Sequence, residues 1–269
     1  MLAHDAAPVE AGRGQEHQLR QASDGAPCPG VALYRFVVSD PKAVLLDVGG
    51  VLLLPAHDRM LGALTRAGFT PAVETLDRAH YSGAGRLLEG AVSTEWPRYW
   101  DDYLDGYITA CGVPNELRTD AHDHLASEFA VAATWTRLAP GAASGLRALA
   151  ATGVRLGVVS NADGTIEQQL RETEVVQVGP GVGIEVECVI DSTVVGISKP
   201  DAGIFRLALD AMGLAPEDTW YVGDMPAFDV AGARRAGIRP FVMDPYQLHL
   251  DAGYDRVSSL TELAERLRG

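Results

Sequence analysis

Cysteine and basic residues are both scarce in this chain, and each shortage disfavours some classes of protein. Cys28, Cys111 and Cys188 are scattered through 269 residues without the spacing of a metal site or a disulfide framework, which favours a reducing, cytoplasmic setting. The chain has 22 lysines and arginines against 36 acids, so its formal net charge is −14. Nucleic-acid binding normally needs a basic face. We therefore expect no nucleic-acid partner.

Long apolar runs are also lacking. No apolar stretch reaches the length of a membrane-spanning helix, and the first residues do not combine a basic region with an apolar one. We therefore expect neither membrane association nor secretion. The hydrophobic content of 47% and the charged content of 22% are ordinary for a globular protein. This length can hold one large α/β domain, or a core domain with a smaller insertion. Nothing in the sequence predicts an oligomeric state.

Three segments of the chain differ in composition and period. Residues 1–38 are rich in Ala, Gly, Gln, Pro and charge without a sustained period, which predicts a disordered tail. Residues 57–138 carry helical patterns and no strand-like run, which predicts a helical insertion. We assign the remaining residues, 39–56 and 139–269, to a core domain.

Buried strands and helices alternate in that core. We predict strands over 43–46, 155–159, 187–190, 219–222 and 240–243, and helices over 142–152, 204–212, 229–236 and 260–267. Gly213 and Gly237 follow two of these helices, where glycine commonly ends a helix. This alternation predicts the α/β class with a parallel, doubly wound sheet.

The most informative residue is Asp47. It follows the apolar run Ala43–Leu46, whose four residues are typical of a strand buried on both faces, and it precedes Gly49 and Gly50. An unpaired buried charge is costly, so packing does not explain an acid at this point. Ligands of open α/β sheets bind at the carboxyl ends of the strands. The position therefore predicts a ligand site.

Polar residues follow four of the predicted elements. They are Asp47; Ser160 with Asn161; Lys199 with Pro200 and Asp201; and the run Gly223–Asp229, which contains Asp224 and Asp229. The carboxyl ends of parallel strands open on one edge of a sheet, so we expect these groups to share a crevice. Two carboxylates suit Mg²⁺, which is typically held by one or two carboxylates and substrate phosphate. A lysine and a hydroxyl suit phosphoryl oxygens, and a carboxylate can act as nucleophile.

These motifs together resemble those of the haloacid dehalogenase-like hydrolase superfamily over about residues 42–268. The resemblance implies a Rossmann-like sheet with a mobile helical cap, for which residues 57–138 occupy the expected slot. It also implies a Mg²⁺-dependent phosphatase acting on a small phosphorylated molecule, with an aspartyl-phosphate formed at Asp47.

The resemblance also implies roles for single residues. Asp47 would be the nucleophile and a metal ligand, and Gly49 would lend its carbonyl oxygen to the metal. Asp224 would be a metal ligand, and Asp229 a second ligand or an outer-shell partner. The phosphoryl group would be bound by residues of the first three motifs, namely Gly50, Ser160, Asn161 and Lys199.

One position departs from the family pattern. Phosphatases of the family typically carry an aspartate two residues after the nucleophile as general acid and base, and here that position is Gly49. General acid–base help is worth roughly 10²–10⁴ in rate. Either water or a nearby group such as His57 or Asp58 transfers the proton, or the substrate has a good leaving group, or the protein has kept binding and lost catalysis.

Other activities of the superfamily fit less well. A haloacid dehalogenase needs no metal, so both acids of the Gly223–Asp229 run would lack a use. A phosphonatase needs a cap lysine, and residues 57–138 contain none. A phosphomutase must move protons in both directions, which Gly49 disfavours. A binding or regulatory protein remains the alternative outside enzymes. In the predicted cap, Arg59, Arg86 and the segment Trp96–Trp100, which includes Arg98, are candidates to contact a leaving group.

Overall fold

Six short segments form one parallel sheet in the computed structural model, which describes residues 40–88, 96–249 and 253–269. The strands are β1 (Ala43–Leu46), β4 (Arg155–Ser160), β7 (Val189–Asp191), β8 (Thr219–Gly223), β9 (Arg239–Met243) and β10 (Asp255–Val257). Their order across the sheet is β10-β9-β8-β1-β4-β7. The strand order reverses at β1, and such a switch point is where ligands bind in this class of fold.

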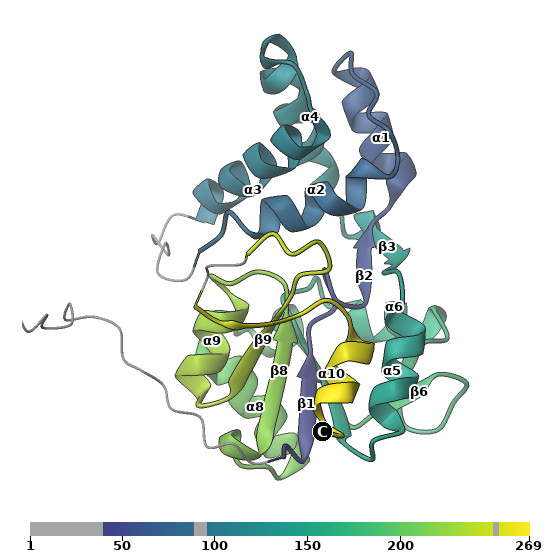
Figure 1. Cartoon of the computed structure of the whole chain (residues 1–269), viewed down its shortest axis with the longest axis vertical. Helices are drawn as coiled ribbons and strands as arrows, with labels where there is room; N and C mark the ends of the chain where they lie inside the picture. The colour runs from purple at the N-terminus through teal and green to yellow at the C-terminus, as the bar shows by residue number, and fades with distance from the viewer. Residues whose placement is uncertain (1–39, 89–95, 250–252) are drawn as a thin grey trace, which may run out of the picture. The chain divides into compact units, whose positions relative to one another are not determined.

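Alternate residues of β1 belong to two different cores, as expected for a strand covered on both faces. Val44 and Leu46 pack in a cluster with residues of α5 (Ala142–Ala150) and α10 (Leu260–Arg266). Ala43 and Leu45 pack in a second cluster with α8 (Ala202–Met212) and α9 (Asp229–Ala236). Helices therefore cover both faces of the sheet (Figure 1), and the predicted doubly wound α/β class is confirmed.

The ends of the core helices follow their local sequence. Gly213 and Gly237 take the left-handed conformation directly after α8 and α9, as predicted. Asp201 is the N-cap of α8, and its carboxylate accepts a hydrogen bond from the amide of Gly203 at 2.7 Å. Two shorter helices, α6 (Ile166–Glu172) and α7 (Ser192–Val195), follow β4 and β7.

The described part of residues 57–138 contains four α-helices with a core of their own. They are α1 (His57–Arg66), α2 (Thr75–Ala84), α3 (Trp96–Cys111) and α4 (Arg118–Phe129). Met60, Leu64, Tyr103 and Leu125 are among the buried residues of that core. The helical character predicted for residues 57–138 therefore holds for most of the described part of this segment.

The prediction that this segment lacks strands was wrong. β2 (Leu53–Pro55) and β3 (Trp135–Leu138) form an antiparallel pair, with Leu53 opposite Leu138. The chain passes from the parallel sheet to the helices through β2 and returns to the sheet through β3 (Figure 1).

Several smaller elements complete the described structure. β5 (Val176–Val178) and β6 (Ile184–Val186) pair with each other, and single turns of 3₁₀ helix lie at Asn115–Leu117, Ala132–Thr134 and Pro216–Asp218. Within the described ranges, no helix combines the length and apolar character needed to cross a bilayer. The tail predicted over residues 1–38 lies outside the described residues.

Candidate active site

The register of the sheet aligns the carboxyl ends of three adjacent strands. Leu46, the last residue of β1, pairs with Val158 of β4 on one side and Val222 of β8 on the other. The amide of Asp47 continues the ladder by donating to the carbonyl of Val222 at 2.8 Å. Polar residues that follow these strands are consequently brought to one edge of the sheet, as the sequence predicts.

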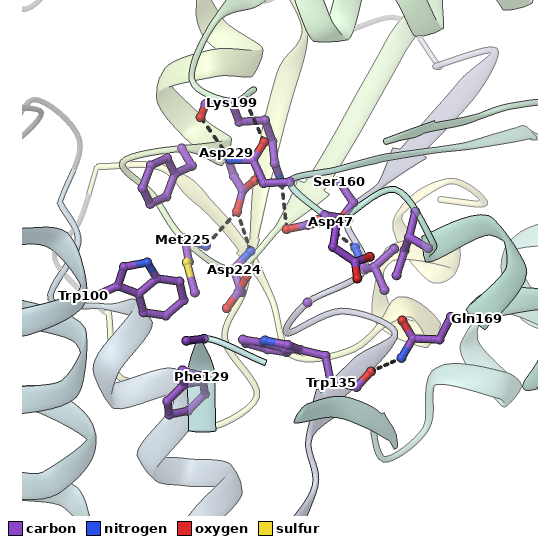
Figure 2. A pocket seen from close by; sticks show the side chains of 18 residues that line it. Asp47, Trp100, Phe129, Trp135, Ser160, Gln169, Lys199, Asp224, Met225 and Asp229 are labelled. Carbon is purple, nitrogen blue, oxygen red and sulfur yellow. Dashed lines mark hydrogen bonds and ion pairs between the residues drawn. The ribbon is translucent and has the colours of Figure 1, made fainter. Parts of the chain in front are cut away.

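A cavity of about 280 Å³ opens at this edge. Its lining includes seven of the eight residues proposed from the sequence: Asp47, Gly49, Ser160, Asn161, Lys199, Asp224 and Asp229. Figure 2 shows the side chains of Asp47, Lys199, Asp224 and Asp229 converging on it.

Gly50 is the eighth proposed residue, and it does not line the cavity. Its carbonyl accepts a hydrogen bond from the Tyr81 hydroxyl at 2.8 Å. The residue has φ +67°, and a Cβ atom there would lie 2.2 Å from Cγ of Asp224. Glycine is therefore required at position 50 because of both backbone conformation and space.

Lys199 is the cationic centre of the site. It is 2% exposed, and its Nζ lies 2.8 Å from Oδ2 of Asp47, 2.7 Å from Oδ1 of Asp229 and 2.9 Å from the Tyr221 hydroxyl. Burial by itself lowers the pKa of Lys199, but the carboxylates of Asp229 and Asp47 raise it above its usual value. Lys199 is consequently an ammonium ion. The sequence contains lysine only at positions 42 and 199.

Burial is the main reason that the pKa of Asp47 rises to about 7. Lys199 opposes this rise, whereas the neighbouring charges of Asp229 and Asp224 add to it. The other carboxylate oxygen, Oδ1, accepts the amide of Val48 at 2.7 Å. Asp47 is therefore close to half ionised near neutral pH when no cation offsets its neighbours.

Asp229 has its carboxylate fully engaged by protein groups. Oδ1 accepts from Lys199 and from the Tyr221 hydroxyl, and Oδ2 accepts from the amides of Asp224 and Met225 at 3.0 and 2.8 Å. These contacts fix the loop after β8 and the position of Lys199. They favour the outer-shell role over direct metal ligation for Asp229.

Asp224 is buried and lies against His80, a residue of α2 that the sequence reasoning missed. Oδ2 of Asp224 and Nε2 of His80 are 3.0 Å apart without the alignment of a hydrogen bond, and neither atom has a hydrogen-bond partner among the described residues. Nδ1 of His80 is 2.8 Å from the Tyr103 hydroxyl. Burial raises the pKa of Asp224, and His80 opposes the rise. An unsatisfied buried carboxylate oxygen is unusual and suits a missing ligand.

The donor set fits a hard divalent cation. Carboxylate oxygens of Asp47, Asp224 and Asp229 lie within 4.8 Å of one another. Oxygen donors are those that Mg²⁺ prefers. Oδ2 of Asp224 has the unaligned contact with His80 and no hydrogen bond to a described residue, so it is a buried acceptor that a cation would satisfy. Three carboxylates against the single ammonium of Lys199 also leave an excess of negative charge.

Ser160, the last residue of β4, and Asn161, which follows it, have different roles. Asn161 donates from Nδ2 to the carbonyl of Lys199 at 3.1 Å and accepts its amide on Oδ1 at 2.8 Å, so it holds the Lys199 backbone. The Ser160 hydroxyl makes no hydrogen bond within the described part of the chain, and it faces the cavity, where it is available to a ligand.

The other candidates from the sequence do not reach the cavity. His57 contacts Asp77, with Nε2 and Oδ1 2.8 Å apart, and Asp58 is exposed. Arg59 pairs with Glu128 at 2.7 Å. None of these residues lines the cavity.

Arg86 and Trp100 differ in their relation to the cavity. Arg86 pairs with Asp105 at 3.5 Å, and neither residue lines the cavity. Trp100, by contrast, is part of the lining. The side chains of Trp96 and Arg98 lie outside the described residues.

A sequence model of the haloacid dehalogenase-like hydrolases matches residues 41–237. The chain belongs to the haloacid dehalogenase-like hydrolases. The resemblance inferred from the motifs is thereby confirmed.

Two relatives of this haloacid dehalogenase-like hydrolase are named as phosphatases. Phosphoserine phosphatase of Thermus thermophilus is 30% identical over 231 residues, which cover 76% of this chain and 88% of the relative. Phosphoglycolate phosphatase of Rhodospirillum rubrum is 33% identical over 230 residues, which cover 83% and 86%. Among solved structures, the HAD phosphatase from Thermococcus onnurineus has a TM-score of 0.50 at 21% identity, covering 85% of this chain and 98% of its own. That structure supports the fold alone.

Proposed function

We propose that this hydrolase is a Mg²⁺-dependent phosphatase of a small phosphorylated metabolite, acting through an aspartyl-phosphate at Asp47. The observation that carries the proposal is the contact of Asp47 with Lys199 at 2.8 Å beside two further carboxylates within 4.8 Å. A nucleophile, a phosphate-binding cation and a metal-binding set then share one cavity. The phosphatase names of the two relatives support the same reading.

Each group has a definite task in this mechanism. Asp47 attacks phosphorus through a carboxylate oxygen, and Lys199 holds the carboxylate and neutralises a phosphoryl oxygen. The free hydroxyl of Ser160 donates to another phosphoryl oxygen. Asp47, Asp224 and the Gly49 carbonyl would hold Mg²⁺, with Asp229 behind them. The bound cation supplies positive charge that offsets the charge of the phosphoryl group and of the carboxylates.

Residues 57–138 are the cap in this proposal. Trp100, Phe129 and Trp135 come from this segment and line the same cavity as Asp47. A segment that supplies the wall opposite the nucleophile limits the access of water and selects the leaving group.

Hydrolysis of p-nitrophenyl phosphate tests the proposed function. We expect turnover with Mg²⁺, a loss of at least about 100-fold on chelation, and no turnover in Asp47→Asn. Asp255→Asn is the matched control, because Asp255 pairs with Arg239 at 2.8 Å outside the cavity, and it should retain wild-type rates. Equal activity in Asp47→Asn and wild type would remove Asp47 as nucleophile.

A haloacid dehalogenase is the second candidate, because the apolar wall of the cavity and Gly49 suit a halogenated acid. The unsatisfied oxygen of Asp224 argues against it, since that chemistry needs no metal. Metal-independent release of chloride from 2-chloropropionate, together with inactivity toward p-nitrophenyl phosphate, would reverse the assignment.

A further inference from the structure

The wall of the cavity that faces the carboxylates is aromatic. Trp100 of α3, Phe129 at the end of α4 and Trp135 of β3 line it, and Figure 2 shows their rings on the side away from Lys199 and Asp229. Ring centroids of Trp100 and Phe129 are 6.0 Å apart with 25° between the planes, and those of Phe129 and Trp135 are 5.9 Å apart. These contacts fix the rings as a surface for an apolar group.

Cations for a second anionic group are lacking in the described lining. Lys199 is the cation there, and it is already bound to Asp47 and Asp229. The amide nitrogen of Gln169, another lining residue, donates to the Trp135 carbonyl. A carboxylate on the leaving group would consequently lose its water without gaining a partner, which is costly.

The side-chain acid that the family places two residues after the nucleophile is also lacking, because position 49 is glycine. A Cβ atom at Gly49 would lie 3.4 Å from Cζ3 of Trp135, in ordinary van der Waals contact, so the indole borders this position. His80 does not line the cavity. Asp163 does, but it is exposed and Oδ1 accepts two hydrogen bonds from Thr165. A leaving oxygen that departs as an anion therefore suits this site best.

An aryloxide is a leaving group that departs readily as an anion. A phenol has a pKa of about 10, whereas the pKa of a hydroxyl as weakly acidic as water is far higher. The more stable aryloxide needs no protonation as the bond breaks. The aromatic wall and the absent acid are independent observations, and both favour the same chemical class.

We infer that the substrate is an aryl phosphate with an uncharged aromatic leaving group, an inference that rests on the proposed phosphatase function. Asp47 forms a bond to phosphorus while the bond from phosphorus to the aryl oxygen breaks, and the aryloxide leaves with that electron pair. It then takes a proton from solvent. Water next attacks phosphorus, releases inorganic phosphate and restores the Asp47 carboxylate, with its proton passing to the solution.

Four substrates test the need for an aromatic ring and the need for a good leaving group separately. Phenyl phosphate has both the ring and the good leaving group, benzyl phosphate has the ring alone, and acetyl phosphate has the good leaving group alone. O-Phosphoserine has neither. We expect kcat/KM for phenyl phosphate to exceed that for benzyl phosphate by about 100-fold or more, the value of the missing acid. We expect O-phosphoserine to be the poorest substrate.

Two variants sharpen the test. Gly49→Asp restores an acid, so it should narrow the ratio of phenyl to benzyl phosphate. Trp100→Leu should lower kcat/KM for phenyl phosphate more than for acetyl phosphate, whereas Trp220→Leu, which changes a tryptophan outside the cavity, should leave that ratio unchanged.

Failures of the two proposals are distinguishable. A ratio of phenyl to benzyl phosphate below 100-fold, or a preference for O-phosphoserine, overturns the inference while hydrolysis that depends on Asp47 keeps the phosphatase function. If all four phosphates are left intact, the phosphatase function fails and the inference fails with it.

Discussion

Asp47 is the nucleophile of the proposed mechanism, and its surroundings decide when it is charged. Burial and the carboxylates of Asp229 and Asp224 raise its pKa to about 7, against the opposing effect of Lys199. A cation bound to the same carboxylate favours the ionised form, because protons and metal compete for the ligand. Protonation of the nucleophile and occupation of the metal site are therefore linked.

This linkage predicts a pH profile that depends on Mg²⁺. At limiting Mg²⁺, kcat/KM should rise as pH increases through about 7, because only the carboxylate of Asp47 attacks phosphorus. Saturating Mg²⁺ should move that midpoint to lower pH by at least about one unit. Profiles with phenyl phosphate at both concentrations provide the measurement. An identical midpoint at both concentrations would contradict the assignment of Asp47 as a metal ligand.

The same pKa predicts how stability without metal varies with pH. A carboxyl whose pKa is raised on folding binds more protons in the folded state, so its stabilisation is complete below the ordinary pKa of 3.8 and is lost as pH rises through about 7. In EDTA, wild-type Tm should fall more between pH 5 and pH 8 than that of Asp47→Asn, which removes this titration.

Two important residues of the site escaped sequence reasoning for physical causes. His80 lies in α2 with Leu76 and Gly83 at helical spacing, and all three are buried. That spacing could have shown a histidine on a buried face. Its contact with Asp224 could not have been predicted, because the two residues lie 144 positions apart in the sequence and meet only in the fold. The place of Trp135 beside Gly49 depends on the same folding.

At the scale of elements, α2 links the helices of residues 57–138 to the loops after β1 and β8. His80 approaches Asp224 after β8, and the next residue, Tyr81, donates to the carbonyl of Gly50 after β1. The amide of Ala227 also donates to the carbonyl of Leu87, just beyond α2, at 2.9 Å. One helix thus contacts both loops that supply metal-binding carboxylates.

Tyr81→Phe tests this link with the loss of one hydroxyl. The Gly50 carbonyl would be left buried without that partner, at a cost of about 1–3 kcal/mol. For a chain of this size we expect Tm to fall by roughly 2–10 °C. Tyr246→Phe is the matched control, because its ring lies 5.8 Å from that of Tyr81 and its hydroxyl makes no hydrogen bond within the described ranges. Equal Tm values for the two variants would show that the Tyr81 contact contributes nothing.

The elements also show where sequence patterns fail. Five of the six parallel strands were predictable because each is a short, mainly apolar run between turn residues. The sixth strand, β10, was missed because Asp255–Val257 has no such run. β3 was missed because Trp135–Leu138 has no such run, and its residues are partly exposed. Its strand conformation depends on pairing with Leu53–Pro55, about 80 positions earlier, and no local pattern reports such a partner.

At the scale of the whole molecule, negative charge is concentrated where a cation is needed. The chain carries a formal charge of −14, and three of its acids are buried around one cavity. Buried like charges destabilise the folded state unless something offsets them. The Mg²⁺ of the proposed function should therefore also stabilise the fold, since the unfolded chain does not hold these acids together.

This predicts a rise in Tm on addition of Mg²⁺. Saturation at about 100 times the dissociation constant contributes about 2.7 kcal/mol, which corresponds to roughly 5–10 °C at this size. Asp224→Asn should abolish most of the rise, whereas Asp255→Asn, which removes the same charge at the surface, should keep it. Thermal unfolding in MgCl₂ and in NaCl of matched ionic strength separates binding from screening. An equal rise in both salts would mean that general screening, rather than a cation at these carboxylates, stabilises the protein.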